Sequence, residues 1–220
     1  MRPKFSTLIL LTIVSAVLLV PFALSPIYLD ALRDRSFDLH QFLRGEIYKQ
    51  GTGYAALVLV VIEMLLTARK RSRSWPIKVR LPGSVLLWRS LHIFTGVALL
   101  AMVVIHTVGA VGFNYNAVLL WSFVGVTLTA LLGVVAETGI LESPRKVFSF
   151  AGFGAAKGKA EATDVKAVGV AKGGVAKAEG IGKGALIRNL RVVWLQPHIW
   201  LVSVFLVLLA VHIFLVYYYR

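Results

Sequence analysis

The chain has 220 residues, of which 58% are hydrophobic, and it carries 24 lysines and arginines against 10 aspartates and glutamates, with no cysteine. So apolar a composition excludes an ordinary soluble domain. The lack of cysteine excludes disulfides, a cysteine-ligated iron–sulfur cluster on this chain and a c-type haem, which needs a Cys-x-x-Cys-His attachment site.

Five apolar segments follow one another along the chain. A helix needs about 20 apolar residues to cross the hydrocarbon core of a bilayer at a rise of 1.5 Å per residue. The segments lack the alternation of barrel strands. We therefore predict an all-α integral membrane protein, a single transmembrane domain over 1–220. Its spanning helices are predicted at 7–29, 53–68, 86–112, 117–141 and 192–217.

The first segment has the length of a cleaved signal peptide. Pro26 directly follows its only small-residue cleavage site, at 23–25, so we expect a retained helix instead. The third and fourth segments are joined by the short stretch VGFNYN, which predicts an antiparallel hairpin.

Basic residues are concentrated in alternate connections. The connection 69–89 has seven and no acidic residue, and 142–191 has ten against four acidic ones, whereas 30–52 has four of each sign. The positive-inside rule then predicts a cytoplasmic N-terminus and an outer C-terminus, in a prokaryotic inner membrane. Because the charge follows the topology, we expect no nucleic-acid binding. The Ala/Gly/Lys-rich connection 142–191 is predicted to be a flexible cytoplasmic loop or an arm ordered by a partner.

Four of the five histidines lie inside predicted spanning helices, in two pairs. His92 and His106 are 14 residues apart, as are His198 and His212. Fourteen residues make four helical turns less about 40°, so each pair shares one helix face with the rings about 21 Å apart. Both helices run in the same direction. We therefore expect His92 level with His198 near the cytoplasmic surface, and His106 level with His212 near the outer surface.

Two facing imidazoles in an apolar bundle suit haem b, whose iron takes two axial nitrogens and whose porphyrin fills an apolar gap. Zinc usually takes four ligands, whereas each level offers two histidines. Copper sites with two histidines usually add a sulfur ligand, and this sequence has no cysteine. We predict two haems b, an inner one held by His92 and His198 and an outer one held by His106 and His212. The alternatives are a non-redox transporter of metal ions or protons, and an anchor subunit, because a membrane histidine can also bond a neighbouring helix or line a polar cavity.

Residues near these histidines extend the predicted cofactor site. Gly96, one turn after His92, would let a flat macrocycle approach, although ordinary helix packing also uses glycine. Arg89 and Arg191 are predicted partners of the inner haem propionates, with snorkelling to the interface as the alternative. His40 is expected on the surface. The outer propionate candidates are Arg33, Arg35, Arg44, Tyr217 and Arg220.

Two carboxylates, Glu63 and Glu137, fall inside apolar runs. Because a charge there is costly, a proton path or a quinone site beside the inner haem is one interpretation. The other is pairing with a basic residue near the interface, for which the candidates are Arg69, Arg71 and Arg145.

The paired histidines, 14 residues apart on two parallel helices, resemble those of the di-haem b-type membrane cytochromes, and the topology is similar to that of the ferric-reductase and NADPH-oxidase membrane domain. The resemblance covers roughly 53–217. It implies that the last four helices form a haem-binding bundle, and that the chain is an electron-transfer subunit of an oxidoreductase complex rather than a complete enzyme. The sequence has neither a PEWY-like quinol motif nor flavin and nicotinamide domains. We therefore expect a cytochrome c-type or iron–sulfur partner subunit, with quinone as a further possible substrate.

Overall fold

The computed structural model describes residues 3–71, 82–144, 147–148 and 181–219. Five of the helices in these ranges are long and apolar enough to cross a membrane, as expected for an all-helical integral membrane protein. The helices are α1 (Phe5–Arg35), α2 (Phe37–Arg44), α3 (Glu46–Arg71), α4 (Val85–Thr107), α5 (Tyr115–Glu142) and α6 (Lys183–Tyr218). Two short strands, β1 (Val147–Phe148) and β2 (Ile181–Gly182), pair antiparallel.

Most of the long helices extend beyond the apolar segments that predicted them. α1 continues to Arg35, and the outer connection predicted over 30–52 contains α2 and the start of α3. α6 begins at Lys183, so residues 183–191 are helical rather than part of a loop. Backbone hydrogen bonding continues through polar residues outside the apolar stretch, which is why hydropathy alone places these ends too far inward.

α4 is shorter than predicted and ends at Thr107 instead of 112. Val108 and Gly109 adopt left-handed backbone angles, with φ of 54° and 65°, and this conformation stops the helix. The hydroxyl of Tyr28 on α1 donates a hydrogen bond to the Val108 carbonyl and holds the turn in place. Asn114 then caps α5, with its side chain accepting from the Ala117 amide.

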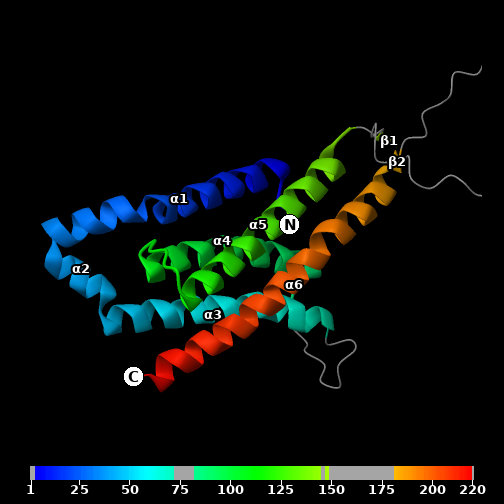
Figure 1. Ribbon diagram of the computed structural model, residues 1–220. Coiled ribbons are helices and arrows are strands. Elements are labelled where there is room, and N and C mark those ends of the chain that lie inside the picture. The colour runs from blue at the N-terminus through cyan, green and yellow to red at the C-terminus, as the bar shows by residue number, and fades with distance from the viewer. Residues whose placement is uncertain (1–2, 72–81, 145–146, 149–180, 220) are drawn as a thin grey trace, which may run out of the picture.

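The helices pack mainly as two pairs, α3 with α4 and α5 with α6, while α1 packs against both α4 and α5 (Figure 1). Phe22 of α1 contacts Leu120 and Val124 of α5, and Val103 and Val104 of α4 pack against the same cluster. α4 and α5 make little direct contact with each other after their connecting turn, so the hairpin predicted for them is open. α2 and the C-terminus lie at one end of the molecule, and the two strands lie at the other (Figure 1).

A single hydrophobic cluster joins the four helices α3 to α6 at mid-height. It consists of Val60, Leu99, Leu100, Phe123 and Phe205, and Leu18 and Leu19 of α1 pack against it. Leu99 lies midway between His92 and His106 in the sequence, and Phe205 lies midway between His198 and His212. All five long helices thus contribute to the core, whereas the sequence predicted a bundle of the last four. The core separates two levels of histidines.

Gly133 of α5 packs against Trp194 of α6. The indole of Trp194 lies directly on it, so that a Cβ atom at this position would overlap the ring. Gly125, two turns earlier on α5, meets Leu201 of α6, and a Cβ there would lie 3.5 Å from Leu201 Cδ1, an ordinary contact.

We predict that Gly133→Ala destabilises the protein by about 1–3 kcal/mol, because the added methyl group must displace the Trp194 ring or part the two helices. Reversible unfolding in detergent micelles, followed by tryptophan fluorescence, measures this loss. Gly125→Ala is the matched control and should leave stability nearly unchanged. Equal stabilities for the two variants would contradict this packing.

Candidate functional site

The two histidines of α4 are held from α3. His92 Nδ1 is paired with Glu63 Oε2, and the Glu63 side chain is only 8% exposed. His106 Nδ1 lies 3.0 Å from Thr52 Oγ1. Since α3 packs along the length of α4, one polar residue of α3 meets each ring.

The two histidines of α6 are held in the same way from α5. His198 Nδ1 lies 3.2 Å from Thr129 Oγ1 and 3.2 Å from the Val126 carbonyl oxygen. His212 Nδ1 lies 2.9 Å from Asn116 Oδ1. Each ring-bearing helix is therefore fixed in rotation by its own neighbour.

These partners determine which ring nitrogen carries the proton. The main-chain carbonyl of Val126 and the Asn116 amide oxygen can only accept, so the Nδ1 atoms of His198 and His212 donate to them. Thr52 uses its own proton to bond the Tyr48 carbonyl, 2.7 Å away, and so also accepts from His106. In a neutral imidazole with its proton on Nδ1, the Nε2 atom has a free lone pair. Among the described residues, no polar group hydrogen-bonds to any of the four Nε2 atoms.

The expected pairs lie near one another: His198 is within electrostatic range of His92, and His106 is within electrostatic range of His212. Over the part of the chain that the structure describes, no Cα atom of α4 comes within 8 Å of one in α6. The described parts of these two helices therefore have no close backbone contact with each other.

A charged cluster lies beside the His92/His198 level. Glu137 of α5, with a side chain 3% exposed, is paired with Arg191 of α6 and, at 3.4 Å, with Arg89 of α4. This carboxylate ties three helices together, and two guanidinium groups for one carboxylate leave an excess positive charge. The two arginines predicted to bind propionates thus share one carboxylate.

Glu63 and Gly96 adjoin each other. Glu63 bonds His92 and not Arg69, which donates to the Gly83 carbonyl at 2.7 Å. The nearest atom to a Cβ built on Gly96 is Glu63 Oε1, at 4.0 Å, so Gly96 lies beside this carboxylate. Oε1 is buried without a hydrogen-bond partner in the described structure. Arg145 and the side chain of Arg71, the other predicted partners, lie outside the described residues.

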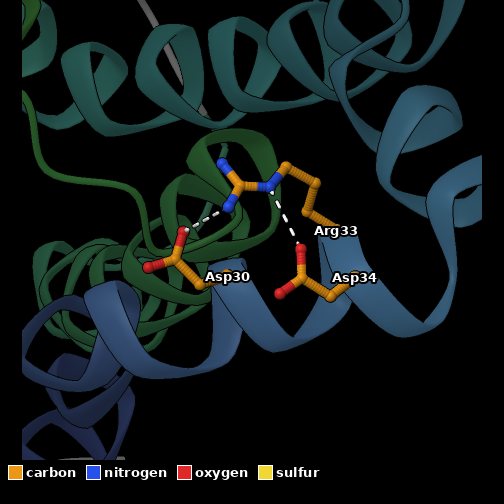
Figure 2. A network of polar contacts seen from close by, with 3 residues as sticks. All are labelled: Asp30, Arg33 and Asp34. Atoms are coloured by element: carbon orange, nitrogen blue, oxygen red, sulfur yellow. Dashed lines mark hydrogen bonds and ion pairs between the residues drawn. The ribbon is translucent and has the colours of Figure 1, made fainter.

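The residues proposed for the outer propionates are dispersed. Arg33 is bound by carboxylates of its own helix, at 3.6 Å from Asp30 and 3.3 Å from Asp34 (Figure 2). The Tyr217 hydroxyl bonds that of Tyr54. The remaining candidates are Arg35 and Arg44, both exposed, and Arg220, which lies outside the described residues. His40 lies partly exposed on α2.

Several residues of the site carried no signal in the sequence. Thr52, Asn116 and Thr129 hold rings, and a Cβ on Gly53 would lie 3.3 Å from His106 Cε1. Comparison of the chain with protein-family models, curated proteins and solved structures found no match. Any function is therefore to be inferred from the geometry of these residues.

We predict that Glu137→Gln lowers stability by about 1.5–3 kcal/mol, because it removes a charge-assisted hydrogen bond to Arg191 and an ion pair with Arg89. Unfolding in micelles, measured by circular dichroism, provides the value. Glu142→Gln, at the exposed end of the same helix, should cost far less. A loss for Glu142→Gln as large as that for Glu137→Gln would contradict the bridging role.

Proposed function

We propose that the chain is a di-haem cytochrome b, the membrane subunit of an electron-transfer complex. The axial ligands are His92 with His198 and His106 with His212. The observation that carries the proposal is shared by the four imidazoles: Nδ1 of each is held by a neighbouring helix, and among the described residues no polar group bonds to any Nε2. When bound, haem b supplies one-electron transfer.

The donor set fits this cofactor better than a zinc ion. Two nitrogen ligands at each level are what a bis-histidine haem requires, whereas a structural zinc ion takes four ligands. Within the described ranges, no group of three or more His, Cys, Asp or Glu side chains could hold a metal ion. Hydrogen bonds to Nδ1 orient a ligating ring and raise its basicity, as is usual for metal-bound histidines.

The chain supplies the surroundings as well as the ligands. Leu99, Leu100 and Phe205 keep the space between the two levels apolar and exclude water from it. At the inner level, the excess positive charge of Arg89 and Arg191 would attract carboxylate groups of the cofactor. At the outer level, Gly53 has no side chain, so the His106 ring can lie close to the backbone of α3.

The orientation and the partners are part of the proposal. The distribution of basic residues favours a cytoplasmic N-terminus, with His92 and His198 on the cytoplasmic side of a prokaryotic inner membrane. Electrons would pass between a quinone or a redox partner subunit and an acceptor on the other side. A cytochrome c-type or iron–sulfur subunit is the expected kind of partner.

A transporter of protons or metal ions is the second candidate. The observation that favours it is the buried pair of Glu63 with His92, since ionisable groups inside an apolar bundle commonly mark an ion pathway. The two candidates differ in whether the purified protein contains haem.

We predict two haems b per chain in the purified wild-type protein, measured by the reduced-minus-oxidised spectrum and the pyridine haemochrome assay. The double variant His92→Ala/His198→Ala should retain one haem, because both changes affect the same site. His92→Ala/His212→Ala should retain none, because it removes one ligand from each site. His40→Ala is the control and should retain both.

The absence of a haem b signal from monodisperse wild-type protein would contradict the proposal and favour the transporter. Retention of one haem by His92→Ala/His212→Ala would contradict the assignment of ligands to pairs.

A further inference from the structure

The four rings differ in the charge of their Nδ1 partners. His106, His198 and His212 bond to neutral oxygens of a hydroxyl, a carbonyl and an amide. Only His92 bonds to a carboxylate, that of Glu63, which is 6% exposed as a residue. A negative charge thus touches one ligand of the inner level and none of the outer level.

The outer level has a cation in the corresponding place. Lys49 Nζ donates to the main-chain carbonyl of His106 at 2.6 Å, and the Lys49 charge acts on the His106 ring. Lys49 and Glu63 are both on α3, 14 residues apart, which is also the separation of His92 and His106 on the antiparallel α4. One helix face of α3 therefore presents opposite charges to the two levels.

The other charges near the two levels are offset or exposed. At the inner level, Arg89 and Arg191 share Glu137, and the negative charge of Glu63 offsets the one positive charge that this cluster has in excess. At the outer end, Arg33 is paired with Asp30 and Asp34 on an exposed surface, where solvent screens the charges. Among the described residues, Glu63 and Lys49 are the charged side chains that bond directly to ligand residues, so their fields act at the shortest range.

Resting on the proposed function, we propose that Glu63 and Lys49 give the inner site the lower reduction potential and the outer site the higher one. A carboxylate on Nδ1 strengthens the imidazole as a donor and favours the oxidised iron. A nearby ammonium group favours the site that holds the added electron. The two side chains are positioning residues that act through His92 and His106.

This order sets the direction of electron flow. In the haem-loaded protein, one electron would leave the inner haem held by His92 and His198, which would be oxidised, and reach the outer haem held by His106 and His212, which would be reduced, with no bond made or broken. A quinol or an iron–sulfur subunit on the cytoplasmic side would re-reduce the inner haem, and a cytochrome c-type subunit of higher potential would accept the electron from the outer haem.

A potentiometric titration of the full-length, haem-loaded protein tests this order. Glu63→Gln keeps an oxygen for the His92 ring but removes the negative charge, so it should raise only the lower midpoint potential. The expected rise is at least about 59 mV, which corresponds to a tenfold change in the oxidised-to-reduced ratio. Lys49→Gln should lower only the higher midpoint. Lys49→Arg and the exposed Glu142→Gln are the charge-retaining and charge-removing controls and should leave both unchanged.

The double variant His92→Ala/His198→Ala provides a test that does not depend on Glu63→Gln binding haem. It leaves the outer haem alone and should show only the higher midpoint. If it shows the lower midpoint, or if Glu63→Gln and Lys49→Gln leave the midpoints in place, the inference is overturned while the proposed function stands. A wild-type protein without haem b would instead contradict the proposed function itself.

Discussion

A polar atom inside an apolar helix must find a partner on a neighbouring helix, because the bilayer offers it no water. In this protein that requirement decides which helices pair. α3 provides Glu63 and Thr52 to the rings of α4, and α5 provides Thr129 and Asn116 to the rings of α6. The helix pairs joined by these bonds are also the two that pack most extensively. Interhelical hydrogen bonding and side-chain packing thus favour the same arrangement.

The two helix pairs use different means to meet each other. At mid-height they share an apolar cluster that includes Leu99 and Phe205. Towards one end, Glu137 on α5 reaches Arg89 on α4 and Arg191 on α6, and so spans the divide between the pairs. α1 closes the assembly on another side through Phe22. No single helix forms the core, and the histidine levels lie above and below its middle.

The length of the apolar segments was sufficient to predict the five long helices. The helical period, which returns a side chain nearly to the same face after 14 residues, places two histidines on one face of α4 and two on one face of α6. It could not predict the Nδ1 partners, because spacing along one helix does not say which face its neighbour covers. Glu63 was expected to pair with an arginine or to form a proton or quinone site, and its contact with His92 depends on the register between α3 and α4. The end of α4 was placed too late, because a left-handed Val108 contradicts the usual preference of a β-branched residue and depends on the contact of the turn with Tyr28.

The Nδ1 bonds have a consequence for the thermodynamics of ligand binding. They are made between side chains and backbone of this chain, so the four rings have lost much of their rotational freedom before anything reaches Nε2. A ligand that binds at Nε2 does not have to order the rings, so its binding free energy is not reduced by that loss of conformational entropy. The helices act in this sense as a preorganised receptor, whose rigidity was acquired during folding.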